Sequence, residues 1–330
     1  MAAMTLLASC GGTASAPASG SPSAAQPAAS ARTSAANLQT MKIAIPNKGL
    51  GLGWLDVAQA LGYFERQGLR AEVTAMPPAT SIAALQAGEL DYMTSTGSAT
   101  RAILSGNVPI RIVYIAANRP GFLLVGAKGI TDVSQLRGKV VAGYAPQNTV
   151  NAVLVELLRR RGLDPSQYTL VNAGADDGRG AAIVNGVASA TIFEVGSAVP
   201  FIKQGYPVLA NAAEQVEVPF TGLIASTAAL QAKRDFMKRG MAAVIEGQRT
   251  MRTQKDQAVP ILAKAFDLGA DDVARILDEL QPGWSTDGRP SAEAIKFEFQ
   301  QDMQDMKLSS LPREDQIYDF SLLDELSGKA

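Results

Sequence analysis

From Met41 onward, the sequence alternates short apolar runs with amphipathic stretches, and this alternation restricts the fold more than any other feature. Short apolar runs between helical stretches are typical of β-strands in a parallel sheet. The first run is 41–46, and the clearest helical stretch is 147–161, with aliphatic residues along one face. The pattern therefore predicts an α/β protein whose mostly parallel sheets are flanked by helices.

The expected strands fall into two groups, which suggests two lobes. The chain leaves the first group near residue 120, builds the second, and returns at a strand over 222–226 before a helical tail that runs to about Lys307. We therefore expect residues 41–120 plus 222–330 to form lobe 1 and residues 121–221 to form lobe 2, around a ligand cleft. The other expected strands are 41–46, 68–75, 88–93, 110–116, 122–126, 139–143, 168–171, 190–193 and 208–210.

The first 40 residues have a different composition. Cys10, the single cysteine of the chain, ends a short apolar run and is followed by a stretch rich in Ala, Ser, Pro, Gly and Thr. This arrangement is typical of a lipoprotein signal, in which the thiol is acylated. We interpret 1–10 as the signal segment and 11–40 as a disordered Ala/Ser/Pro linker. A chance cysteine is the alternative, since residues 1–5 lack the usual Lys or Arg.

The composition narrows the possible functions. The chain has no histidine, so Ser-His and Cys-His nucleophile pairs and ordinary zinc sites are excluded. A net charge of -1 gives no electrostatic basis for binding nucleic acid. We therefore expect a monomeric binding protein, with no catalytic residue, no metal and no cofactor. Membrane contact is expected only through lipid on Cys10, which places the protein in the periplasm or at the cell surface.

Two polar loops stand where expected strands lead into expected helices. The first contains Ser95, Thr96, Gly97 and Ser98, and the second contains Asn148 and Thr149. Such residues are good helix N-caps, which is the simpler interpretation. They also form a cradle for an anionic or polar ligand, because the free N–H groups of a helix start point outward. We predict that both loops contact one ligand.

Further ligand-binding candidates lie near these loops. The glycines of 49–53 permit close approach of backbone to ligand, so we select Gly51, Gly53 and Trp54, although Trp54 fits ordinary helix–sheet packing equally well. Glycine spacing here does not match a dinucleotide-binding motif. Asp176, Asp177 and Arg179 are expected to meet solvent. The remaining candidates are Glu194 at a strand end, Arg119 as an anion partner or a bridge between lobes, and Phe220 as an apolar wall.

The order of these segments resembles periplasmic substrate-binding proteins of ABC importers, in the nitrate/sulfonate/taurine and thiamine-precursor superfamily. The resemblance covers about residues 41–229, and the segments that carry it are 54–69, 87–91, Gly97-Ser98, 136–141 and 161–165. It implies a two-lobed periplasmic binding protein fold of type II, which closes on a small solute and delivers it to an ABC permease in the inner membrane. A yeast branch that makes a thiamine precursor relies on histidine and cysteine, so its activity does not carry over.

We therefore expect an extracytoplasmic lipoprotein that captures a small organic anion, with a sulfonate or an aromatic carboxylate favoured. Two alternatives remain open at this point. One is a lyase-like enzyme on the same fold, against which the absence of histidine argues. The other is a ligand sensor for a signalling receptor, which the sequence does not separate from an import protein.

Overall fold

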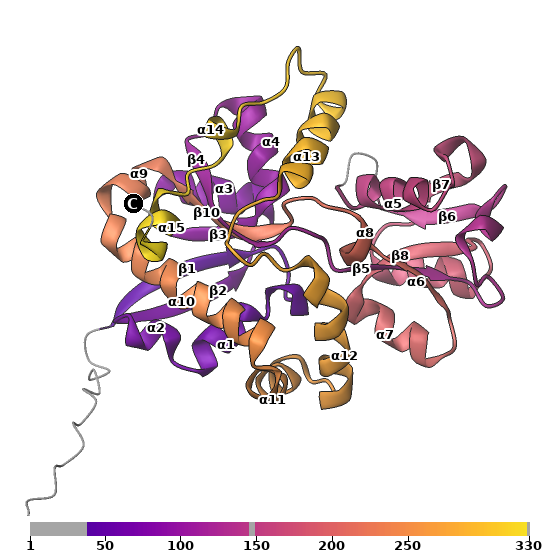
Figure 1. The fold of residues 1–330 in the computed structure, drawn as a ribbon, viewed down its shortest axis with the longest axis horizontal. Helices are drawn as coiled ribbons and strands as arrows, with labels where there is room; N and C mark the ends of the chain where they lie inside the picture. Colours follow the sequence, from indigo (N-terminus) through magenta and orange to yellow (C-terminus); the bar gives the residue numbers. More distant parts are fainter. Residues whose placement is uncertain (1–37, 145–148, 329–330) are drawn as a thin grey trace, which may run out of the picture. The chain divides into compact units, whose positions relative to one another are not determined.

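The computed structural model describes residues 38–144 and 149–328, which form two five-stranded sheets flanked by helices (Figure 1). The first sheet has the order β2-β1-β3-β10-β4, and the second has the order β7-β6-β8-β5-β9. The strands are β1 Gln39–Ile45, β2 Leu69–Ala75, β3 Tyr92–Ser95, β4 Ile110–Ala117, β5 Phe122–Gly126, β6 Val140–Gly143, β7 Thr169–Asn172, β8 Ala190–Glu194, β9 Val208–Asn211 and β10 Thr221–Ser226.

The helices lie between and after these strands. They are α1 Trp54–Ala60, α2 Tyr63–Arg66, α3 Pro78–Ala87, α4 Thr96–Gly106, α5 Thr149–Arg160, α6 Asp176–Val184, α7 Val195–Lys203, α8 Ala212–Gln215, α9 Thr227–Ala232, α10 Arg234–Thr253, α11 Lys255–Phe266, α12 Ala270–Leu280, α13 Ala292–Asp305, α14 Glu314–Ile317 and α15 Ser321–Ser327. Short 3-10 turns are η2 Leu50–Leu52, η3 Val133–Leu136, η4 Pro165–Gln167 and η5 Gln281–Gly283. None of these described helices is long and apolar enough to cross a bilayer.

Both sheets are mostly parallel, as the sequence predicted. In the first sheet, β1 runs parallel to β2 and β3, while β10 runs antiparallel to β3 and β4. In the second sheet, β6 runs parallel to β7 and β8, while β5 runs antiparallel to β8 and β9. The antiparallel strands β5 and β10 are the ones that follow a crossing between the sheets, and each enters its new sheet with its direction reversed.

The segments that cross between the sheets are bonded to one another. The backbone N–H of Val218 donates to the carbonyl of Asn118 at 2.8 Å, and that of Phe220 donates to the carbonyl of Ala117 at 2.9 Å. A third segment joins them, because the N–H of Asn118 donates to the carbonyl of Gly283 at 2.8 Å. The described residues belong to one compact unit. Their division into lobes 41–120 plus 222–330 and 121–221 stays a prediction.

Several element boundaries differ from the sequence-based expectation. β1 begins at Gln39, so the proposed linker 11–40 extends two residues too far. The third strand is Tyr92–Ser95 rather than 88–93, because Gly88 ends α3 in a left-handed conformation and the chain turns before it enters the sheet. Helices α6 and α7 were not expected. Residues 1–37, which hold the predicted signal segment with Cys10 and most of the predicted linker, lie outside the described residues.

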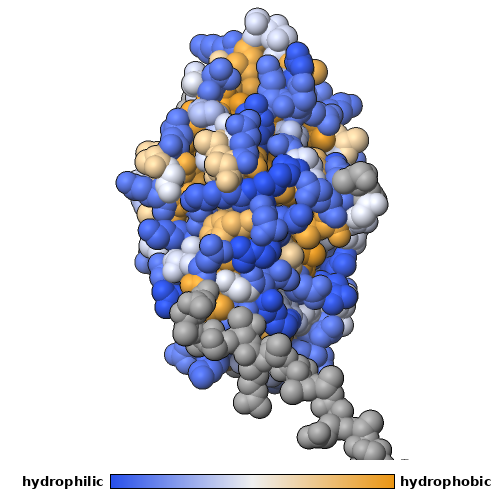
Figure 2. All heavy atoms as spheres, turned by 90° about the vertical axis from the view of Figure 1, so that its left-hand side faces the viewer, coloured by the Kyte–Doolittle hydropathy of each residue, from blue (hydrophilic) through white to orange (hydrophobic). Residues whose placement is uncertain are grey.

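The core consists of aliphatic strand residues covered by helices. The largest buried cluster contains Ile43 of β1, Leu123 of β5 and Val244 of α10, so it includes residues of both sheets. A second cluster joins α5 to the second sheet, and a third joins α4 to the first. On the face drawn in Figure 2, hydrophilic side chains surround small, separate apolar groups. Apolar area is thus mainly buried between helices and sheets, which stabilises the fold.

Candidate functional site

A cavity of about 440 Å³ lies where strand ends of both sheets meet the crossing segments. This is the position at which ligands collect in open α/β sheets. Nine of the twelve predicted ligand-binding residues line the cavity: Gly51, Ser95, Thr96, Gly97, Ser98, Arg119, Thr149, Glu194 and Phe220. The other lining residues are Pro46, Asn47, Gly49, Leu52, Pro78, Thr94, Ala117, Gly121, Phe122, Tyr144, Val150, Asp176, Pro219, Thr221, Leu280 and Trp284.

The start of α4 faces the start of α5 across this cavity. A Cβ atom placed on Gly97, at the first turn of α4, would lie 3.4 Å from Oγ1 of Thr149, the first residue of α5. Ser98 and Thr149 line the same cavity. The free N–H groups at a helix start carry partial positive charge, so two such starts create a favourable environment for an anion without a formal cation.

The hydroxyl groups of the first loop differ in their availability. Oγ1 of Thr96 faces the carbonyl oxygens of Pro219 and Phe220, each 2.7 Å away, and donates to the crossing segment. Oγ1 of Thr94 donates to the carbonyl of Ala44 at 3.4 Å. Ser95 is the N-cap residue of α4, yet its side chain makes no capping bond. The structure therefore gives Thr96 a bond within the protein and leaves the Ser95 hydroxyl unused in the cap.

Glu194 brings a carboxyl group into the cavity from the end of β8. A Cβ atom on Gly49 would lie 2.8 Å from its Oε1, so the loop after β1 passes close to this carboxyl group. Burial, together with the nearby charge of Asp176, raises the pKa of Glu194 to about 7, although a hydrogen bond from the backbone N–H of Gly51 opposes this. Glu194 therefore lies near the point of half-ionisation at neutral pH.

Arg119 lines the cavity, but its charge is partly neutralised. Its guanidinium forms an ion pair with Glu217 and lies 3.3 Å from the carbonyl oxygen of Glu214. Arg119 follows β4, while its partners lie on the returning segment before β10, so the contact joins the two crossings. Among the described lining residues, Arg119 carries the only positive charge.

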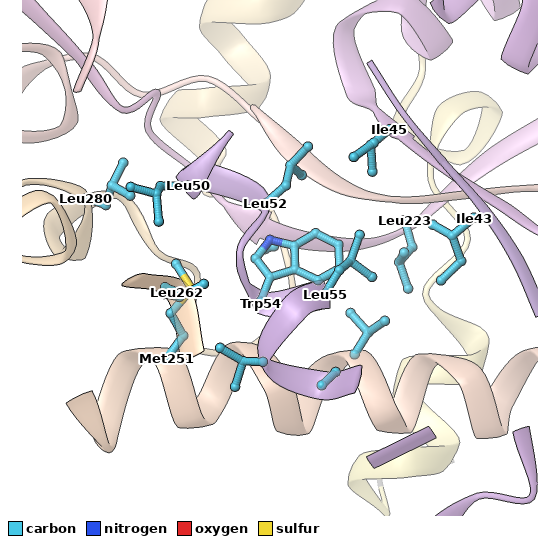
Figure 3. Close-up of a cluster of buried hydrophobic side chains, with 14 of the residues drawn as sticks. Ile43, Ile45, Leu50, Leu52, Trp54, Leu55, Leu223, Met251, Leu262 and Leu280 are labelled. Atoms are coloured by element: carbon cyan, nitrogen blue, oxygen red, sulfur yellow. The ribbon is translucent and has the colours of Figure 1, made fainter. Parts of the chain in front are cut away.

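Gly53 and Trp54 do not line the cavity, contrary to their predicted place beside a ligand. Trp54 is 1% exposed and lies in the largest apolar cluster, with Leu52, Leu55 and Leu262 drawn around it in Figure 3. A Cβ atom on Gly53 would lie 2.6 Å from Cδ2 of Leu262, so this glycine permits α11 to pack closely. Both residues serve helix packing, which was the alternative interpretation for Trp54.

The expectation that Asp176, Asp177 and Arg179 meet solvent was wrong for Arg179, whereas Asp177 is exposed and the Asp176 side chain is 39% exposed. All three belong to α6, Asp176 lines the cavity, and Arg179 is fully buried. The guanidinium of Arg179 lies 3.6 Å from the ring centroid of Tyr144, pairs with Asp176 and donates to the carbonyl of Ile192 at 3.1 Å. An acidic pair at a helix start, Asp176 and Asp177, was the one local signal for this part of the site, and no local signal indicates that the arginine is buried.

The apolar walls come from several elements. Phe220 meets Phe122 edge to face, with ring centroids 5.6 Å apart, and Leu280 and Trp284 extend the wall from the C-terminal tail. The tail residues were missed because their distance in sequence from the other lining residues hides the contact. Asn148 lies outside the described residues, as does any contact it makes. In the described part of the chain, no cluster of acidic residues could hold a metal ion.

Comparison with solved structures shows the fold. The periplasmic aliphatic sulphonate-binding protein SsuA from Escherichia coli is 18% identical, with a TM-score of 0.70 over 86% of this chain and 99% of that chain. The periplasmic nitrate-binding protein NrtA from Synechocystis PCC 6803 is 14% identical, with a TM-score of 0.63 over 88% of this chain and 89% of that one. The chain thus has the periplasmic binding protein fold, as the sequence predicted.

One neighbour has a different role. A DszB mutant in complex with biphenyl-2-sulfinic acid, an enzyme, is 12% identical, with a TM-score of 0.65 over 88% of this chain and 99% of that one. Most of the neighbours are binding proteins. A search of curated protein sequences gives no match. The family model described as NMT1/THI5 like matches residues 54–258.

Proposed function

Because the chain belongs to the NMT1/THI5-like family, we propose that it is a solute-binding lipoprotein of an ABC importer. In this proposal the protein works in the periplasm or at the cell surface, held by lipid on Cys10, and delivers its solute to an inner-membrane permease. Solved neighbours that are periplasmic sulfonate- and nitrate-binding proteins support the transport role. The composition of the first 40 residues supports the lipid anchor.

The observation that carries the proposal is the meeting of two helix starts at one cavity. The start of α4 belongs to the first sheet and the start of α5 to the second, and both line the same space. A solute that contacts both stabilises the arrangement in which the sheets are close together. Such differential binding is the thermodynamic basis of closure around a ligand, since a solute shifts the equilibrium only by its preference for one state.

The walls favour a small organic anion as the solute. Phe122, Phe220 and Trp284 offer apolar area for an aromatic or aliphatic body, while the helix starts and hydroxyl groups suit oxyanion oxygens. Nitrate has no apolar body to fill these walls, and Arg119 is already paired with Glu217. An aromatic carboxylate or a sulfonate therefore fits the cavity better than nitrate does.

A thermal-shift screen with sulfonates, aromatic acids, nitrate and pyrimidines tests this proposal. A solute present at 100 times its dissociation constant adds about 2.7 kcal/mol to stability, which is easily measured. The double variant Ser98→Ala, Thr149→Ala should lose this ligand-induced stabilisation, while its ligand-free melting point stays nearly unchanged. A double variant that gains full stability from the same ligand would show that the site is misplaced.

A further inference from the structure

Thr221 occupies a special position at the start of β10, beside the cavity. It lies opposite Ser95 in the pairing of β10 with β3 and opposite Ala117 in the pairing with β4. Residues directly opposite each other in antiparallel strands place their side chains on the same face, about 5 Å apart. Ser95 and Thr221 both line the cavity. The two residues are therefore neighbours in one wall of the cavity.

The hydroxyl of Thr221 has no hydrogen-bond partner among the described residues, although the side chain is only 9% exposed. Its neighbour Thr96 bonds to the crossing segment, so that hydroxyl is satisfied within the protein. A buried polar group without a partner destabilises a folded protein, and each such group calls for an explanation. The other residues of β10 are buried, so valine at position 221 would be more stable in this strand than threonine with an unpaired hydroxyl.

We propose that the Thr221 side chain turns its buried hydroxyl toward the solute, and that this hydroxyl donates its hydrogen bond to an anionic oxygen of a carboxylate or sulfonate. This inference rests on the proposed function and assigns a residue of the same cavity. The Ser95 hydroxyl and the backbone N–H groups at the first turn of α4 line the same cavity and supply further donors for this acidic group. The solute satisfies a hydroxyl that the protein itself leaves unpaired, so its acidic group lies against the first sheet.

Thr221→Val in the full chain tests the assignment, because valine keeps the branched shape and removes only the hydroxyl. The ligand-free melting midpoint should rise by about 2–5 °C, since a buried unpaired group is lost. The apparent affinity for benzenesulfonate or benzoate, whichever stabilises the wild-type protein, should fall about tenfold or more, as expected for a hydrogen bond to a charged group.

Thr191→Val is the matched control. Thr191 is a fully buried strand threonine on β8 that does not line the cavity, and its hydroxyl donates to the carbonyl of Ala142 at 2.9 Å. Removing it should lower the melting midpoint and leave the affinity for the probe unchanged. Without ligand, the two valine variants should therefore shift the melting midpoint in opposite directions. With ligand, only Thr221→Val should lower the affinity for the probe.

Two results would overturn the assignment. One is a Thr221→Val protein with a lower ligand-free midpoint, because the hydroxyl would then have a structural partner. The other is an unchanged affinity for a probe that stabilises the wild type. If neither probe stabilises the wild-type protein, the proposed solute class fails, whereas the sign of the ligand-free shift still decides whether Thr221 is unpaired. The two failures are thus separable.

Discussion

We predict that Glu298 of α13 makes the stability of this protein dependent on pH. Its carboxyl group is 5% exposed, and its Oε2 accepts a hydrogen bond from the Tyr318 hydroxyl at 3.1 Å. Asp302 lies one turn further along α13 and pairs with Arg101 at 3.0 Å. Burial, together with the charge of Asp302, raises the pKa of Glu298 to about 8.

The direction of the effect follows from the protons bound in each state. Between pH 4.5 and 8, the folded protein keeps a proton on Glu298 that the unfolded chain has released. The free energy of unfolding therefore falls as the pH rises through this window, and the contribution is complete only below the ordinary pKa. The difference between 4.5 and about 8 corresponds to at most about 5 kcal/mol. Burial raises the pKa of Asp302 to about 6, which acts in the same direction.

Urea unfolding at pH 5.5 and pH 8.5 measures this contribution. Glu298→Gln keeps the shape of the side chain and its hydrogen-bonding capacity but cannot ionise. We expect the wild-type protein to lose several kcal/mol more than the variant between the two pH values. Glu246→Gln is the control, because Glu246 is an exposed residue of α10 that pairs with Arg249 on the same helix. If Glu298→Gln loses as much stability as the wild type between the two pH values, the Glu298 carboxyl does not cause the pH dependence.

Further substitutions test the packing role of Gly53 and the effect of Glu194 on ligand affinity. Gly53→Ala should destabilise the protein by about 1–3 kcal/mol in the same urea assay, because the added Cβ meets Leu262. Gly51→Ala should leave the free energy of unfolding nearly unchanged, because nothing lies within 4 Å of its Cβ. Equal effects of the two substitutions would contradict the packing role of Gly53. The affinity for an anionic solute should weaken as the pH rises through about 7, because Glu194 becomes negatively charged. Calorimetric titration should show little of this pH dependence for Glu194→Gln. An equal decline in affinity for both proteins would contradict the role of Glu194.

The sequence predicted those features that depend on local pattern. Alternation of apolar runs indicated the strands, and the loops before α4 and α5 were identified because they carry more hydroxyl and amide residues than helix capping alone requires. β5 was predicted with its observed bounds because a run of apolar residues ends at Gly126.

Features that depend on distant contacts were not predictable in this way. Trp54 was assigned to a ligand wall because nothing local distinguishes an indole in a core from one beside a cavity. Arg179 was assigned to solvent because its partners are distant in sequence: Ile192 lies on β8 and Tyr144 follows β6. Leu280 and Trp284 reach the cavity from the tail. Thr221 stands out only because its hydroxyl has no hydrogen-bond partner in the described part of the chain, which a sequence pattern does not reveal.

The place of β10 in the first sheet has a consequence for biogenesis. β10 lies between β3 and β4, so these two strands have no partner on their facing edges until residue 226 has been synthesised. The second sheet needs only residues 122–211 and is complete earlier. During synthesis, the second sheet can therefore form first, while β3 and β4 of the first sheet keep unpaired edges until β10 is available. Such waiting edges are prone to aggregation, and long-range closure of this type slows maturation.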